Sequence, residues 1–287
     1  MEPARQGGMK HALCFPNAGE CDPRTLGELA KQAQDAGWDG VFIEDYIVYQ
    51  ATDLPTYDPW VCLASVALHT DTVQLGTLVT PPSRRRPWKL AAEATSVDHL
   101  SNGRLIVGIG LGDTAEPGFT AVGEHLEARV RAELVDESLA ILDGLWRGTP
   151  FSFHGRHFTI EDLTLRARPV QRPRIPLWIG GGWPNAGLKH RLPRWDGSCA
   201  YKHPVESGED MMPDDIRELA GAVMAVRGSL DGYTIAVGGR RRADDWEQER
   251  DHIASVHEAG ATVWMEWAPP ADLQEMRRVA DREPLRT

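Results

Sequence analysis

The chain has 287 residues, a formal net charge of −11 and a pI near 5.4, and 41% of its residues are hydrophobic. This length suits one large α/β domain or two small ones. The acidic balance argues against nucleic acid and against an anionic membrane surface as partners. No apolar segment approaches the ~20 residues that are needed to cross a bilayer.

The N-terminal residues 1–10 lack the apolar stretch of a signal peptide. We expect them to form a disordered leader before a single domain at 11–287. The chain contains four cysteines, Cys14, Cys21, Cys62 and Cys199. They show neither CxxC nor metal-ligand spacing, so we expect no metal site and reduced thiols in a cytoplasmic protein.

Short apolar runs alternate with amphipathic stretches along the chain. In chain order they predict a strand at 11–16, a helix at 23–36, a strand at 39–46, a helix from 59, a strand at 73–80, a helix at 87–100 and a strand at 105–110. A helix at 126–146 follows, then a strand at 175–181, a helix at 185–192, a strand at 197–201, a helix at 213–227, a strand at 233–238, a helix at 244–259, a strand at 261–267 and a helix at 271–280.

Eight strand–helix pairs at this length predict a closed (β/α)₈ TIM barrel. An open doubly wound sheet would carry GxGxxG after the first strand, where Asn17-Ala18-Gly19 stands instead. The long segment 147–174 contains two apolar stretches around His154-Gly155-Arg156. We expect a small hairpin inserted between the fourth helix and the fifth strand, lying over one end of the barrel.

The active site of such a barrel lies at the C-terminal ends of its strands. Candidates at these ends include Glu44, Asp45, Tyr46, Thr80, Gly110, Gly180 to Trp183, His203, Arg240 and Trp267. Gly180-Gly181-Gly182 directly precede a predicted helix, whose free N–H groups could hold an anion. The arginines at 84–86 and 240–242 could also meet a phosphate, although runs of charge more often form solvated or structural ion pairs.

Three stretches, 75–113, 41–46 and 168–182, resemble the bacterial luciferase-like family of flavin-dependent oxidoreductases. The longest contains the block DHLSNGRLIVGIG, and the resemblance extends from Leu13 to Met265. It implies a luciferase-like barrel that binds reduced FMN, or in one branch the deazaflavin coenzyme, over the strand ends.

The resemblance also implies roles for individual residues. Leu78-Val79 matches the place of a non-proline cis peptide behind the flavin ring. Glu44, Asp45 and Tyr46 match an acidic–histidine element in which Tyr46 replaces the histidine. Asp45 would orient a flavin or substrate group, or would simply cap a loop. The implied cofactor contacts are Leu78, Val79, Thr80, Gly110, Gly180, Gly181, Gly182 and Trp183.

Three further assignments remain hypotheses. Arg240 would meet the phosphate charge of the cofactor. His203, after the sixth strand, would act as an acid or base beside Tyr46 and Asp45, or would simply belong to an ordinary loop. Asp98 and Arg104 would form a structural salt bridge at the N-terminal end of the barrel.

The resemblance favours an FMN-type monooxygenase that acts on a small organic substrate with O₂. Reduced FMN would come from a separate flavin reductase, because no nicotinamide fingerprint is visible. The alternatives are hydride transfer with the deazaflavin and a flavin-binding protein without catalysis. A homodimer is compatible with the family.

Overall fold

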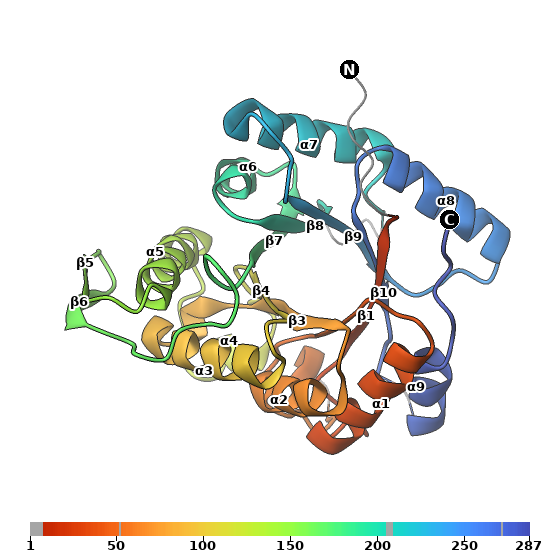
Figure 1. The fold of residues 1–287 in the computed structure, drawn as a ribbon, viewed down its shortest axis with the longest axis horizontal. Coiled ribbons are helices and arrows are strands. Elements are labelled where there is room, and N and C mark those ends of the chain that lie inside the picture. The colour runs from red at the N-terminus through yellow and green to blue at the C-terminus, as the bar shows by residue number, and fades with distance from the viewer. Residues whose placement is uncertain (1–7, 52, 205–208, 271) are drawn as a thin grey trace.

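The structure is a computed structural model that describes residues 8–51, 53–204, 209–270 and 272–287. Eight parallel strands close a barrel in the order β1-β10-β9-β8-β7-β4-β3-β2 (Figure 1). These strands are β1 (Lys10–Phe15), β2 (Gly40–Ile43), β3 (Gln74–Thr80), β4 (Leu105–Ile109), β7 (Leu177–Trp183), β8 (Gly197–Lys202), β9 (Thr234–Arg240) and β10 (Val263–Trp267). The predicted TIM barrel is therefore confirmed.

Helices surround this barrel, with α1 to α3 on one side and α6 to α8 on the other (Figure 1). The α-helices are α1 (Pro23–Asp35), α2 (Pro59–His69), α3 (Pro87–Leu100), α4 (Pro117–Thr120), α5 (Ala128–Trp146), α6 (Ala186–Arg191), α7 (Pro213–Arg227), α8 (Trp246–Glu258) and α9 (Leu273–Ala280), and three 3₁₀ turns are η1 (Tyr49–Ala51), η2 (Pro82–Arg84) and η3 (Leu192–Arg194). Asp22 and Asp58 cap α1 and α2 through their side chains, as their place before proline predicts. Within the described residues, no helix combines the length and apolarity that a membrane span requires.

The N-terminal segment begins the barrel earlier than expected. Residues 1–7 of the expected leader lie outside the described residues. Met9 is buried and Lys10 already belongs to β1, where its N–H donates to Thr262 O at 3.0 Å. Lys10 therefore belongs to the barrel and not to the expected leader, because it pairs with Val263 of β10.

The side chains of the barrel strands pack in two clusters, one inside the barrel and one between the strands and the helices. This follows because successive residues of a strand point to opposite faces of the sheet. The inner cluster consists of Ala12, Cys14, Phe42, Ile106, Trp178, Ala236, Val263 and Met265. Phe42 and Trp178 stack across it with ring centroids 5.3 Å apart. A much larger outer cluster joins the strands to the helices. This alternation decides which residues of each strand can face a site inside the barrel.

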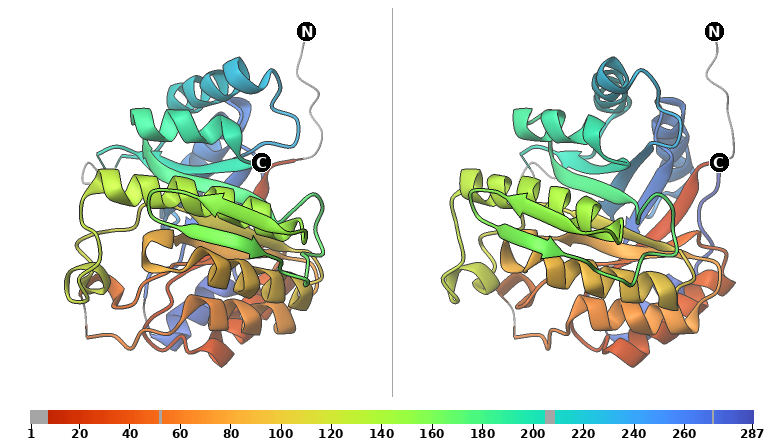
Figure 2. Two further views of the ribbon diagram at one scale, coloured as in Figure 1. Left: turned by 90° about the vertical axis from the view of Figure 1, so that its left-hand side faces the viewer. Right: turned by 60° about the vertical axis from the view of Figure 1, so that its left-hand side comes forward.

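The hairpin lies outside the barrel. Strands β5 (Phe151–His154) and β6 (Thr159–Leu163) pair antiparallel and run alongside α5 (Figure 2). The Glu137 carboxylate of α5 accepts backbone N–H groups of Arg156, His157 and Phe158 at 2.7–3.2 Å. The Phe158 ring meets Trp88 of α3 edge-on. The expected position over one end of the barrel was therefore wrong, because these contacts hold the hairpin on the helix layer.

Asp98 and Arg104 are structural, but they do not form the expected ion pair. Asp98 accepts hydrogen bonds from Val170 N at 2.6 Å and from the Gln171 side chain at 2.8 Å. Arg104 donates to the Thr70 carbonyl at 2.7 Å and to three other carbonyls. Each charged group thus binds backbone at the N-terminal end of the barrel instead of binding the other.

Candidate functional site

The residues that face inward at the C-terminal mouth of the barrel remain partly exposed. They are Glu44, Leu78, Gly180, Cys199 and Trp267. The inner residues below them, such as Phe42 and Met265, are buried. The mouth is therefore the end of the barrel at which a ligand can reach the lumen, as expected for this fold.

Val79 forms a ledge in this mouth. The Leu78–Val79 peptide bond is cis, as the resemblance implies, and the pairing of β3 with β4 shifts register there. A Cβ added at Gly110 would lie 2.5 Å from Val79 Cγ2, and one at Gly180 would lie 2.7 Å from Val79 Cγ1. These two glycines thus make room for Val79, and their implied contacts with the cofactor stay predictions. The Val79 side chain itself is partly exposed in the mouth.

The glycine segment Gly180–Gly182 lies inside β7 and not at the start of a helix. Helix α6 begins only at Ala186 and spans 6 residues. The three glycines therefore do not form the first turn of this helix, and the expected anion site stays a prediction. Trp183 is fully buried, and Lys189 Nζ lies 4.7 Å from the centre of its ring. This burial beneath Lys189 does not favour the cofactor contact implied for Trp183, which stays a prediction.

Asp45 belongs to a buried network and does not reach the mouth. Its carboxylate accepts hydrogen bonds from Thr80 Oγ1 at 2.8 Å, from Arg84 Nη2 at 3.2 Å and from Arg85 Nη2 at 3.1 Å. The Asp45 side chain is 2% exposed. Because both groups are buried and bound to each other, this geometry favours the loop-capping interpretation of Asp45, and the implied cofactor contact of Thr80 stays a prediction.

Arg84 and Glu116 extend this network to a third loop. They form an ion pair, with side chains 3% and 2% exposed. Glu116 also accepts the backbone N–H groups of Ile47 and Val48, and Arg84 lies over the Phe119 ring at 4.9 Å. The loops that follow β2, β3 and β4 are thereby held together around the mouth.

Tyr46 lies at the edge of the mouth on the loop after β2. The Asn17 side chain fixes its backbone by donating to Tyr46 O at 2.7 Å, and its ring packs edge-on against Tyr49 at 5.0 Å. Burial, followed by the nearby charge of Glu44, raises the pKa of Tyr46 to about 12. The phenol therefore remains protonated at neutral pH, so it can donate a hydrogen bond but is a poor base.

Glu44 belongs to the acidic–histidine element at the end of β2, and no individual role was predicted for it. It shares the inward face of β2 with Phe42, whereas Asp45 points outward. Burial raises the pKa of Glu44 to about 7, and the nearby Tyr49 hydroxyl and Trp267 indole act in the opposite direction. The period-two alternation of strands is the signal that separates Glu44 from Asp45.

The remaining predicted residues lie at the rim. His203 is exposed, precedes a cis proline, and donates its backbone N–H to Trp183 O at 3.0 Å. Arg240 forms ion pairs with Asp210 and, at 2.7 Å, with Glu249. Its guanidinium is thus occupied by carboxylates, which favours the structural interpretation over the phosphate contact. In the described parts of the chain, no cluster of three or more His, Cys, Asp or Glu side chains could hold a metal ion.

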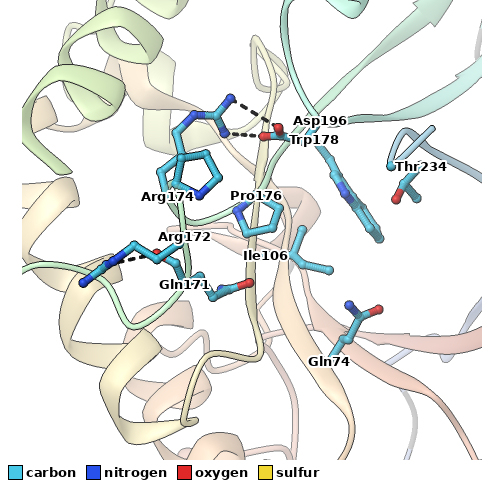
Figure 3. Close-up of a pocket in the computed structure, with 11 residues that line it drawn as sticks. Gln74, Ile106, Gln171, Arg172, Arg174, Pro176, Trp178, Asp196 and Thr234 are labelled. Atoms are coloured by element: carbon cyan, nitrogen blue, oxygen red, sulfur yellow. Dashed lines mark hydrogen bonds and ion pairs between the residues drawn. The ribbon is translucent and has the colours of Figure 1, made fainter. Parts of the chain in front are cut away.

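A separate cavity of about 230 Å³ lies at the opposite end of the barrel. Gln74, Trp178 and Thr234 line it at the starts of their strands. Arg174 and Asp196 form an ion pair at its side (Figure 3). The active sites of TIM barrels lie at the C-terminal ends of the strands. We therefore do not assign an active site to this cavity.

A family model for luciferase-like monooxygenases matches residues 6–254. The F420-dependent glucose-6-phosphate dehydrogenase of Microbacterium testaceum (strain StLB037) is 28% identical over 277 residues, covering 92% of this chain and 77% of that protein. The same enzyme of Amycolatopsis mediterranei (strain U-32) is 27% identical over 284 residues, covering 94% of this chain and 80% of that protein.

Among solved structures, an F420-dependent secondary alcohol dehydrogenase in complex with an F420-acetone adduct superposes with a TM-score of 0.79. The two chains are 17% identical, and the match covers 97% of this chain and 99% of the other, so the likeness shows a shared fold. Because the family model matches most of the chain and the barrel is closed, the protein belongs to the luciferase-like monooxygenase family of oxidoreductases.

Proposed function

We propose that this protein is an oxidoreductase that transfers a hydride between the deazaflavin coenzyme F420 and a small organic substrate. The observation that carries the proposal is the similarity, over more than nine-tenths of the chain, to two F420-dependent dehydrogenases. The same relatives do not support FMN, which the sequence analysis favoured as the cofactor. Under this proposal neither O₂ nor an FMN reductase takes part in the reaction.

The mouth suits a flat tricyclic ring. Leu78, Val79 and Trp267 present partly exposed apolar surface there. The Val79 side chain occupies the space that Cβ atoms at Gly110 and Gly180 would need. Such a ledge would support one face of the ring and keep water from it. When bound, the deazaflavin accepts or donates a hydride at one ring carbon, which requires no O₂.

Other residues orient the bound groups. The protonated Tyr46 phenol would donate a hydrogen bond at the edge of the mouth. The buried network of Asp45, Arg84 and Glu116 would hold the surrounding loops in place without touching the ligand. Catalysis would depend on this fixed geometry, because a hydride must pass directly between two carbon atoms at van der Waals distance.

The loops favour an uncharged substrate over a sugar phosphate. Four cationic side chains near the strand ends are held by carboxylates, namely Arg84, Arg85, Lys202 and Arg240. The loops after β2 and β4 instead carry exposed apolar side chains, namely Ile47, Leu54, Val122 and Leu126. An apolar rim with paired cations suits an alcohol or ketone of low polarity.

Titration of the purified protein with coenzyme F420 and, separately, with FMN tests the cofactor through the change in ligand fluorescence. We expect saturable binding of F420 and much weaker binding of FMN. Reduction of F420 is then followed by its loss of absorbance with secondary alcohols and with glucose 6-phosphate, and we expect turnover with the alcohols. Tight FMN binding with O₂ uptake would instead support the monooxygenase alternative, and F420 binding without turnover would support a non-catalytic protein.

A further inference from the structure

Glu44 occupies a position in the mouth that no other acidic side chain of the described β2 loop shares. Its backbone N–H still pairs with Phe15 O at 3.0 Å, which extends the β2 register by one residue beyond Ile43. This pairing keeps the side chain on the inner face that Phe42 also occupies. Glu44 therefore points toward the lumen, whereas Asp45 is turned into the Arg84 network.

Among the residues that the structure describes, none forms an ion pair with the carboxyl of Glu44. The groups that interact with it in the described residues are Cys14 of β1, Tyr46 and Tyr49 of the following loop, and Trp267 of β10. All four are uncharged at neutral pH. Oε2 of Glu44 is buried and forms no hydrogen bond at normal distance, and the same holds for Nε1 of Trp267. A buried carboxyl oxygen without a hydrogen bond at normal distance calls for an explanation, and a catalytic role is one of them.

The proposed reaction needs a group of this kind. When an alcohol is oxidised, the carbinol C–H bond breaks and its electron pair leaves with the hydrogen to oxidised F420. The O–H bond breaks as well, the C=O bond forms, and one proton must be taken up by a base. Tyr46 remains protonated and Asp45 is bound by two arginines, so neither accepts this proton.

We propose that Glu44 is the catalytic acid and base of this site, which takes the hydroxyl proton of an alcohol substrate and returns it to the carbonyl in the reverse reaction. The inference rests on the proposed function, because it takes F420 as the hydride acceptor. A carboxyl that is half ionised near neutral pH can act in both directions.

The experiment compares the wild type with Glu44→Gln, Glu44→Asp and the exposed control Glu258→Gln. Alcohol oxidation with F420 is measured from pH ~5 to ~9. The kcat of Glu44→Gln should be ~100-fold or more below that of the wild type, and the variant should lack the increase in rate that the wild type shows near pH 7. Glu44→Asp should recover part of the rate with a shifted pH profile, and F420 affinity should change by less than ~3-fold. Glu258→Gln should match the wild type.

A second readout uses the protein without cofactor. Because the pKa of Glu44 is raised from 4.5 to about 7, the folded state binds this proton more tightly than the unfolded chain. The wild type should therefore lose thermal stability relative to Glu44→Gln as pH rises from 4.5 to about 7, with no further change above it.

The outcomes separate the two proposals. If the wild type turns over alcohols with F420 and Glu44→Gln keeps the wild-type rate and pH profile, the role of Glu44 is wrong while the proposed function stands. If Glu44→Gln loses its rate but the stability difference does not change with pH, Glu44 does not titrate as described and the role is also wrong. If the wild type neither binds nor reduces F420, the proposed function fails, and the role of Glu44 fails with it.

Discussion

A Cβ atom at Gly180 would lie 2.7 Å from Cγ1 of Val79, closer than side-chain carbons approach in proteins. The Val79 ledge therefore depends on the absence of a side chain at Gly180. This relation links a residue of β3 with one of β7 across the intervening strand β4.

Gly180→Ala should displace Val79 and disturb the surface on which the cofactor rests. We expect F420 affinity to fall by ~5-fold or more, since a displaced contact surface of this size costs about 1–3 kcal/mol. Gly181→Ala is the matched control, because its Cβ would meet Leu188 at an ordinary 3.4 Å. Fluorescence titration compares the two variants, and equal affinities would show that the ledge does not contact the cofactor.

Removing the charge of Asp45 should destabilise the protein rather than abolish its chemistry directly. Asp45→Asn leaves Arg84 and Arg85 with less compensation inside a buried network. We expect a loss of about 3–5 kcal/mol in the free energy of unfolding. The exposed pair of Lys31 and Asp35 offers the control, since Asp35→Asn should change this free energy by less than ~0.5 kcal/mol. Denaturant unfolding measures both, and a loss for Asp45→Asn as small as that of Asp35→Asn would contradict the structural role.

His11 should make the protein sensitive to acid. Its ring is buried, and burial together with Arg286 lowers the pKa of His11 from 6.5 to about 4. The unfolded chain then binds this proton more tightly, so the wild type loses stability as pH falls from 6.5 toward 4. This loss amounts to roughly 3 kcal/mol at most.

His11→Gln should flatten the pH dependence of thermal stability in this range. His190→Gln, which changes an exposed histidine, should leave the dependence as in the wild type. Thermal melts at a series of pH values measure the slopes. A slope for His11→Gln equal to that of the wild type would mean that His11 is not responsible for the acid sensitivity.

Tyr46→Phe should lower turnover while leaving F420 affinity unchanged. Loss of one hydrogen bond of about 1–1.5 kcal/mol corresponds to a fall of roughly 5–10-fold in kcat. Because the pKa of Tyr46 is about 12, the fall should be the same at every pH near neutrality.

Tyr233→Phe is the control for this variant, because the Tyr233 hydroxyl donates to Leu192 O away from the mouth. We expect it to affect stability but not kcat. Steady-state kinetics with F420 across neutral pH give the comparison. Unchanged turnover in Tyr46→Phe would remove Tyr46 from the reaction.

The repeating strand–helix pattern was enough to predict the barrel. Each short apolar run indicates a buried strand, and each helix-capping side chain binds backbone in the first turn of its own helix. Asp22 and Asp58 are examples of such local signals. The site was predicted less well because its residues take their roles from long-range partners. Asp45 was chosen over Glu44 although only the inner face of β2 reaches the lumen, and the alternation with Phe42 already contained that information.

Charge partners could not be predicted from the sequence. Arg84 pairs with Glu116, 32 residues away, and Arg240 pairs with Asp210, 30 residues away. Neither partner stands at a helical or strand spacing that would indicate the contact. The close approach of Val79 to Gly180 could not be predicted for a similar reason, since the two residues belong to different strands.

The Glu116 carboxylate accepts hydrogen bonds from the backbone N–H of Ile47 and from the side chain of Arg84. These two bonds limit which loops can be exchanged between relatives. A graft of the β4 loop from a relative without this carboxylate would leave a guanidinium uncompensated beneath the β2 loop. Substrate preference should therefore be transferable only when the segments after β2, β3 and β4 are exchanged as one block.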